Sequence, residues 1–238
     1  GLAAPGNWYT PLRRDGGFWV LHQTLGLYRR ALTSYDSTLA YAVLGIVGGV
    51  ASGLLVLAFE AAIHLVTGLW GGTGGADFEH LPPLQRFALP ALSGLALGLA
   101  VSGLTPEHRE VGIVHVISRL HSHYGALPFR NAVAQFLSAT VALGCGHSGG
   151  REGPGVHLGA AVTSLLGQAL RLPNNSLRIL ISCGTAGGIA AAFQTPLAGV
   201  IFAMEVIAGE YSVAGFLPVM LSAVAASAVS SGLPSLSR

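Results

Sequence analysis

Lysine is absent from this sequence, and all twelve basic residues are arginine. Charged residues make up only 9% of the chain, whereas soluble domains carry about 25%. So few charges cannot cover the surface of a water-soluble protein of 238 residues. The formal net charge is only +2 and there is no basic run, so nothing indicates a nucleic-acid partner.

Cysteine is nearly absent as well. Cys145 and Cys183 stand alone in apolar stretches, so neither a disulfide nor a thiolate metal site is expected. The nine histidines are scattered. His121 and His123 are two residues apart and would point to different faces of a helix. We therefore expect no metal and no cofactor.

Apolar residues dominate the sequence. They make up 51% of the chain, and the mean hydropathy is +0.61. Such a chain is expected in a lipid bilayer, where about 20 apolar residues form one span. Gly45, Gly49 and Gly53 recur every fourth residue and predict a tight packing seam on one helix face, and Gly94 and Gly98 repeat this spacing. The uncharged runs are Tyr41–Phe59, Phe87–Leu104, Ile179–Met204 and Gly215–Gly232.

Several apolar segments are short or interrupted. Pro128–Gly144 and Gly153–Leu170 are shorter than a uniform span. Pro196 interrupts a long run, which predicts two half-helices joined at residues 193–195. Short and broken helices are typical of transporters, whose ion sites lie at half-helix ends near the bilayer midplane. We expect an all-α polytopic membrane protein with tilted, short and broken helices.

The first 34 residues differ from the rest of the chain. Aromatic residues there alternate with four arginines, which predicts a cytoplasmic or interfacial segment, 1–34, before a membrane domain, 35–238. Because arginines favour the cytoplasmic side of a span, we expect a multi-pass protein of the cell membrane with its N-terminus in the cytoplasm.

The stretch Ser148–Gly159 carries the clearest functional signal. Glycines lead into Pro154, which we expect at the first position of an apolar helix. Free N–H groups and a partial positive charge at such a helix start bind anions. Glu152 lies at this start, and its carboxylate can occupy the same site. Competition between that carboxylate and a halide would form a gate.

Two motifs resemble the CLC family of chloride channels and transporters. Gly-Arg-Glu-Gly-Pro at Gly150–Pro154 is similar to one family signature. The segment Gly187–Glu205 resembles the region of the family's broken helix pair. The resemblance covers about residues 38–232, which corresponds to the first of the family's two inverted repeats. It implies one half of a CLC-type fold.

The resemblance also implies roles for individual residues. Glu152 corresponds to the gating glutamate, and Gly150, Arg151, Glu152 and Gly153 to the outer anion site. Val111 and Gly112 lie where family members carry a serine and a glycine that contact the central anion. A valine side chain donates no hydrogen bond, so the resemblance implies a central site that is weaker, differently selective or served only by backbone. Chloride, nitrate and fluoride all stay open as the anion.

The position after Glu205 bears on proton coupling. Proton-coupled members place a glutamate where this chain has Val206, so the resemblance favours channel-like chloride transport without stoichiometric proton coupling. Glu205 itself is a candidate for a proton path. The alternative is an H⁺/Cl⁻ or H⁺/F⁻ antiporter of the same family.

The resemblance further implies a homodimer, and the second inverted repeat is missing from this sequence. Two functions of other classes stay open. Gly146-His-Ser-Gly-Gly150 matches a serine-nucleophile pattern, with His157 or His115 as the base of an intramembrane hydrolase. A non-conducting scaffold subunit is the other alternative. We expect a transporter and no enzyme.

Overall fold

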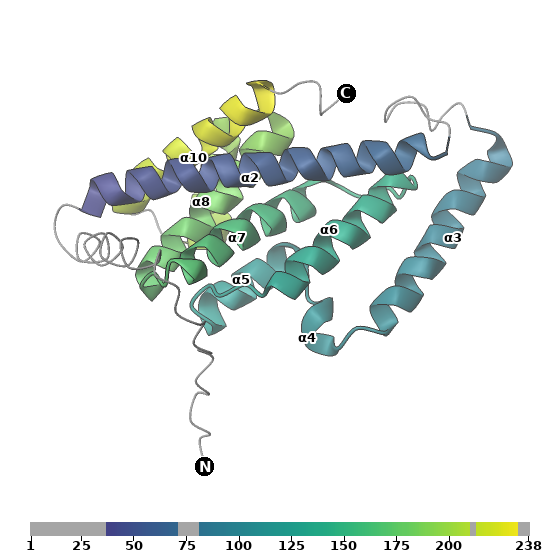
Figure 1. Ribbon diagram of the computed structural model, residues 1–238, viewed down its shortest axis with the longest axis horizontal. Coiled ribbons are helices and arrows are strands. Elements are labelled where there is room, and N and C mark those ends of the chain that lie inside the picture. Colours follow the sequence, from purple (N-terminus) through teal and green to yellow (C-terminus); the bar gives the residue numbers. More distant parts are fainter. Residues whose placement is uncertain (1–36, 71–80, 210–212, 233–238) are drawn as a thin grey trace, which may run out of the picture.

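The computed structural model describes residues 37–70, 81–209 and 213–232, and these ranges are built from helices (Figure 1). The expected segment 1–34 lies outside the described residues. In chain order the elements are α2 (Ser37–Gly68), α3 (Pro83–Ser102), α4 (Pro106–Arg109), α5 (Gly112–Ser122), α6 (Phe129–Gly144), α7 (Glu152–Ala169), α8 (Asn174–Phe193), α9 (Pro196–Phe202), the π-helical turn η2 (Ala203–Ala208) and α10 (Val213–Gly232).

Within the described residues, four helices are long and apolar enough to cross a membrane. They cover Leu39–Gly68, Pro83–Ser102, Asn174–Phe193 and Gly215–Gly232. The predicted all-α, multi-pass architecture is therefore confirmed. The two predicted short segments are also confirmed, since they form α6 with 16 residues and α7 with 18.

α8 forms the centre of the structure. It is buried along most of its length and packs against α2, α7 and α10. Figure 1 shows α2 and α10 running side by side above α7 and α8. The sequence placed the start of this helix at Ile179, more than a turn too late. Pro173 precedes its first turn, and the exposed side of that turn accommodates the charge of Arg178.

The predicted glycine seam on α2 is confirmed. Gly45, Gly49 and Gly53 face the backbone of α10, and a Cβ on Gly49 would overlap the carbonyl oxygen of Ser222. Helices in a membrane approach this closely only where small residues meet. The seam therefore fixes α2 against α10.

A second glycine seam joins α7 to α8. A Cβ on Gly159 would overlap the carbonyl oxygen of Gly184, and a Cβ on Gly184 would overlap that of Gly159. Gly188 meets the carbonyl oxygen of Gly155 in the same way. The two backbones touch without intervening side chains, and this contact places the start of α7 against the buried core.

The break between α8 and α9 lies where the sequence predicted it. α8 ends at Phe193, Gln194 adopts a left-handed conformation with φ 56°, and α9 begins at Pro196. The left-handed residue stops the helix, and proline then starts the next one. Gln194 also donates a hydrogen bond from Nε2 to Ser230 Oγ, which holds the break against α10.

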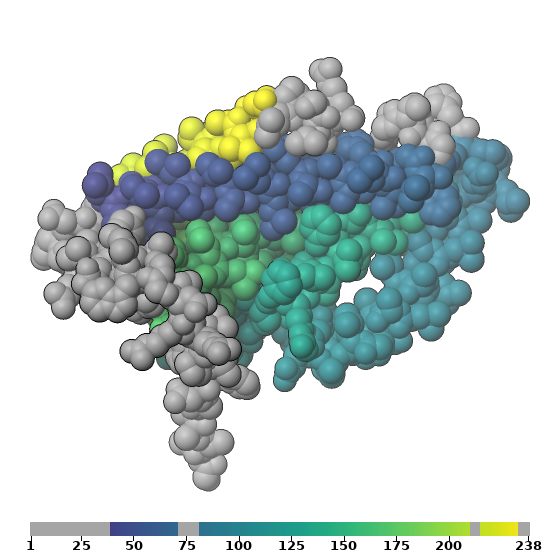
Figure 2. Space-filling model, in the orientation of Figure 1, coloured from purple at the N-terminus to yellow at the C-terminus, as the bar shows by residue number. Residues whose placement is uncertain are grey.

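α3 stands at the margin of the structure (Figures 1 and 2). None of its residues is buried, and its leucines and Phe87 are largely exposed. Of its two predicted packing glycines, Gly94 approaches the imidazole of His147, whereas a Cβ added to Gly98 would meet no atom within 4 Å. One side of α3 packs loosely against α6, and the exposed apolar remainder is expected to face lipid or further protein.

Candidate anion-binding site

The candidate site is built at the start of α7. The helix begins at Glu152, Arg151 is the residue before it, and the Gly155 amide donates the first intrahelical hydrogen bond to the Arg151 carbonyl at 2.9 Å. Pro154 is therefore the third helical residue, not the first as the sequence predicted. Proline is tolerated there for the same reason, because amides of the first turn have no intrahelical acceptor.

This helix start leaves three backbone donors. The amides of Arg151, Glu152 and Gly153 precede the first intrahelical hydrogen bond. They lie at the positive end of an 18-residue helix, whose partial charge favours an anion. These donors have the arrangement that the sequence predicted for an anion-binding helix start, and anion binding itself stays a prediction.

Glu152 folds back over the turn that precedes it. Its carboxylate lies so close to Gly150 that a Cβ on Gly150 would overlap Glu152 Oε2. Only glycine leaves room for the carboxylate in this position. Glu152 is exposed on the surface of this chain, so the carboxylate is free to move away from the turn without displacing core residues.

Arg151 makes an ion pair that the sequence did not predict. Its Nη1 atom lies 3.6 Å from Oε1 of Glu60 on α2. Glu60 is buried, with 8% of its surface exposed, while the Arg151 side chain is about half exposed. The only available signal was an acidic residue at the end of an uncharged span. Arg151 thus connects the Gly-rich turn to α2.

Val111 and Gly112 lie at the start of α5, the second predicted anion contact. Gly112 is the first helical residue and has φ +80°, a conformation that favours glycine. Val111 precedes it in an extended conformation. The side-chain amide of Asn131, on α6, donates to the carbonyls of Glu107 and Glu110 at 2.8 Å each. These bonds fix the loop before α5.

α5 and α7 are joined by a buried histidine pair. His115 Nδ1 and His157 Nε2 share a hydrogen bond of 3.0 Å, and the ring centroids are 5.2 Å apart. His115 is 3% exposed and His157 is fully buried. The pair links the two helices whose starts carry the predicted anion contacts. No sequence pattern indicated this contact, because the two residues are 42 positions apart.

This pairing leaves Ser148 without contact to either base that the sequence offered for the hydrolase alternative. The sequence offered His115 and His157 as the base for Ser148. In the structure the two imidazoles pair with each other, and Ser148 is exposed in the turn before α7. A nucleophilic serine needs a base within hydrogen-bonding reach, and neither histidine bonds to it.

Glu205 lies apart from these groups, in the π-helical turn η2 that follows α9. Its side chain is exposed, as is that of Val206. Met204 and Ile207 on the same turn are buried. No contact within the described part of the chain connects Glu205 to Glu152, so its predicted role in a proton path stays a prediction.

The chain matches the family described as "Voltage gated chloride channel" over residues 92–237. It is 33% identical to the ClcB-like chloride channel protein of Ralstonia nicotianae, over 78% of this chain and 44% of the relative. It is also 33% identical to the H(+)/Cl(-) exchange transporter ClcA of Vibrio vulnificus, over 76% of this chain and 40% of the relative. A CLC-type fluoride/proton antiporter of known structure aligns with a TM-score of 0.69 and 28% identity, over 84% of this chain and 48% of that one. The chain thus spans less than half the length of these relatives.

Proposed function

Because the chain belongs to the voltage gated chloride channel family, the CLC family, we propose that it forms the anion-binding half of a membrane anion transporter with Glu152 as its gate. The observation that carries the proposal is the start of α7. There, three free backbone donors lie at the positive helix end, beside a carboxylate that folds over Gly150. The carboxylate and a halide compete for the same donors.

Gly150, Arg151, Glu152 and Gly153 form the outer anion contact in this proposal. Val111 and Gly112 form a second contact made by backbone amides at the start of α5. Arg151 contributes its backbone amide to the anion contact, because its guanidinium is paired with Glu60. Chloride is the first candidate ligand, since both sequence relatives are named for chloride.

We favour proton-coupled exchange over the channel-like transport expected from Val206. One relative is named an H(+)/Cl(-) exchange transporter and the structural relative is a fluoride/proton antiporter. Both resemble this chain over three quarters or more of its length. The absence of a glutamate at Val206 then requires a different proton route. Glu205 is one candidate for it.

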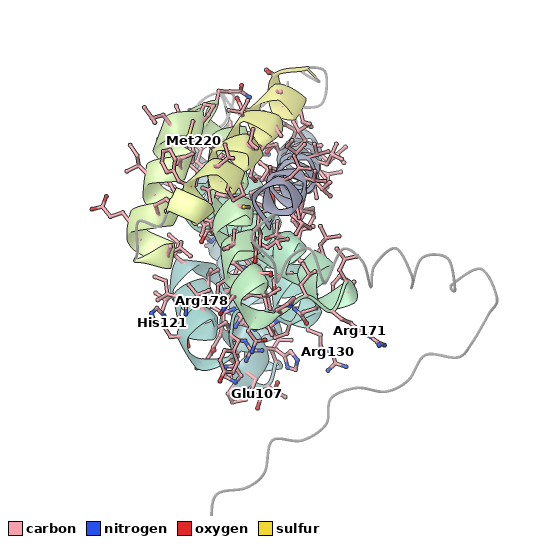
Figure 3. The ribbon with its side chains drawn as sticks, turned by 90° about the vertical axis from the view of Figure 1, so that its left-hand side faces the viewer. Glu107, His121, Arg130, Arg171, Arg178 and Met220 are labelled. Carbon is pink, nitrogen blue, oxygen red and sulfur yellow. The ribbon has the colours of Figure 1, made fainter. Side chains whose placement is uncertain are left out.

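The orientation proposed for the membrane follows from the arginines. Arg130 lies in the first turn of α6, Arg171 follows α7 and Arg178 lies near the start of α8. Figure 3 shows all three in the lower part of the view, together with Glu107. Arginine-rich ends face the cytoplasm in most membrane proteins. The first turns of α2 and α8 lie together, because the Tyr41 hydroxyl forms a 2.9 Å hydrogen bond with that of Ser176. The N-terminal side of α2 is therefore cytoplasmic in the proposal.

Two features of assembly are part of the proposal. A second inverted repeat completes the ion pathway, which agrees with a chain that spans 40–44% of its sequence relatives. Homodimerisation follows the family resemblance. The exposed apolar residues of α3 and α9, such as Leu92 and Leu197, provide surface for lipid or for these protein contacts.

The test is a paired flux measurement on the full-length protein in liposomes. A chloride gradient should drive chloride efflux, and a pH electrode should record proton movement in the opposite direction at a fixed ratio. Chloride efflux without proton movement would show that the protein is a chloride channel and not an exchanger. No anion flux at all, from correctly folded protein, would favour the non-conducting scaffold.

A further inference from the structure

The histidine pair between α5 and α7 is the starting point of a further inference. Buried polar atoms in folded proteins nearly always have hydrogen-bond partners. His157 is fully buried, yet its Nδ1 atom has no partner among the described residues. An unpaired buried polar atom costs about 1–3 kcal/mol. Two apolar side chains would fill this place at lower cost, so packing alone does not explain the pair.

Glu110, His115 and His157 follow one another in a row, so that each side chain faces the next. Glu110 Oε2 is 3.9 Å from His115 Nε2. His115 then uses its other nitrogen, Nδ1, to reach His157 Nε2 at 3.0 Å. His157 ends the series with the unpaired Nδ1. Each imidazole can therefore receive a proton at one ring nitrogen and give one from the other. The step between the imidazoles is a hydrogen bond, whereas the 3.9 Å step from Glu110 is an ion-pair distance that the exposed Glu110 side chain must shorten, or a water must bridge, before a proton passes.

One end of this series is open to water and the other is buried. The Glu110 side chain is 61% exposed, whereas that of His115 is 2% exposed. Asn131 holds the Glu110 carbonyl and the Glu107 carbonyl together. Glu107 lies in the same lower part of the view as Arg130, Arg171 and Arg178 (Figure 3). The open end of the series is thus on the side proposed to face the cytoplasm.

The inner end of the series lies on the helix that carries the gate. His157 follows Glu152 on α7, at about 7.5 Å along the helix axis. The charged and titratable groups around His115 are Arg119, Glu110 and His123, in or beside α5, and His157 faces it from α7. Burial lowers the pKa of His115 most strongly, Arg119 and His123 lower it as well, and Glu110 raises it.

We propose that Glu110, His115 and His157 form a proton relay from the cytoplasmic surface into α7. This inference rests on the proposed function, because it supplies the proton route that exchange requires. The relay places the proton route on Glu110, His115 and His157, and not on Glu205 in the η2 turn. The relay explains how a chain with Val206 at the usual acidic position still moves protons.

Each transfer along the relay moves one proton. A proton leaves the Glu110 carboxyl group and binds His115 Nε2. His115 gives its Nδ1 proton to His157 Nε2, and His157 gives its Nδ1 proton to a water molecule. Glu110 is left as a carboxylate, and both imidazoles are neutral with the proton on Nε2. The starting state returns when each ring flips and Glu110 takes up a proton from water.

The test separates a relay from a structural hydrogen bond. His115→Asn keeps a side-chain amide near the Nδ1 position, and His157→Gln keeps one near the Nε2 position, but neither amide passes a proton on. In full-length protein in liposomes, each substitution should lower proton flux at least about tenfold while chloride flux stays within about twofold of wild type. His121→Gln, on the exposed side of α5, is the control and should change neither flux.

A further variant covers the case in which the buried substitutions prevent folding. Glu110→Gln changes an exposed side chain and should lower proton flux several-fold. Unchanged proton flux in Glu110→Gln and in folded His157→Gln would overturn the relay, as would a parallel loss of both fluxes in Glu110→Gln. If the wild-type protein moves chloride and no protons, the exchange function itself fails. That result is distinguishable because it appears before any substitution.

Discussion

The guanidinium of Arg151 lies 3.6 Å from the carboxylate of Glu60 and ties the turn before α7 to α2. The pair joins two residues from distant parts of the chain. Glu60 is a buried acid on a membrane-spanning helix, and Arg151 immediately precedes the candidate gating glutamate. The ion pair therefore links the packing of α2 to the position of the candidate anion site.

Replacing Arg151 should destabilise the fold, because the buried carboxylate of Glu60 is then left without its partner. Arg151→Gln should lower the free energy of unfolding by about 1–3 kcal/mol, because Glu60 loses its charged partner. Adding Glu60→Gln should recover part of this loss. Thermal unfolding in detergent measures both. Arg86→Gln, at the exposed start of α3, is the control and should change stability by less than about 0.5 kcal/mol. Equal stability of all these proteins would contradict the coupling.

Glu152→Gln tests the gate. The amide carries no charge and does not titrate, so the variant should conduct chloride with little dependence on pH. In the wild type, one protonation event changes flux by up to about tenfold per pH unit. Chloride flux from liposomes across a pH series measures both responses.

The control for the gate is Glu107→Gln, an exposed acid on the short helix α4. It should keep the wild-type pH response. A Glu152→Gln protein whose flux follows pH as the wild type does would show that another group controls the gate.

The seam between α2 and α10 gives a prediction for stability. Gly49→Ala places a Cβ into the backbone of Ser222 and should destabilise the fold by about 1–3 kcal/mol. Gly98→Ala on α3 meets no atom within 4 Å, so it should be neutral or stabilising by up to about 1 kcal/mol. Thermal unfolding of the two variants in the same detergent makes the comparison. Similar effects at both positions would argue that α2 and α10 are not in close contact.

Val111→Ser tests the second anion contact. A hydroxyl at this position adds a donor at the start of α5, and a hydrogen bond to a charged group is worth about 1.5–3 kcal/mol. Anion affinity measured by calorimetry should then rise by about tenfold or more. Val114→Ser, with 79% of its surface exposed, should leave the affinity unchanged. No gain from Val111→Ser would place the anion away from this helix start.

Local features of the sequence predicted much of the fold. Pro196 marked the break between α8 and α9, and the spacing of Gly45, Gly49 and Gly53 marked the contact with α10. Both follow from backbone rules that act within a few residues. The start of α7 was predicted too late, at Pro154, because proline is accepted anywhere in a first turn.

Contacts between residues far apart in the chain could not be predicted from the sequence. Glu60 and Arg151 come from different helical segments, and His115 and His157 are 42 positions apart. Nothing in either local pattern indicates its partner, because only the packing of α2, α5 and α7 brings them together. The candidate gate could be predicted from Gly150–Pro154. The ion pair of Arg151 with Glu60 and the histidine pair on α5 and α7 could not.

The glycine seam between α7 and α8 has a mechanical consequence. Gly159 and Gly184 meet backbone to backbone, so there is no side chain between them that could repack as the helices slide. Sideways movement of α7 would require α8 to move with it. In the proposed function, opening of the pathway would therefore be confined to the side chain of Glu152 and the turn at Gly150, while α7 itself stays in place.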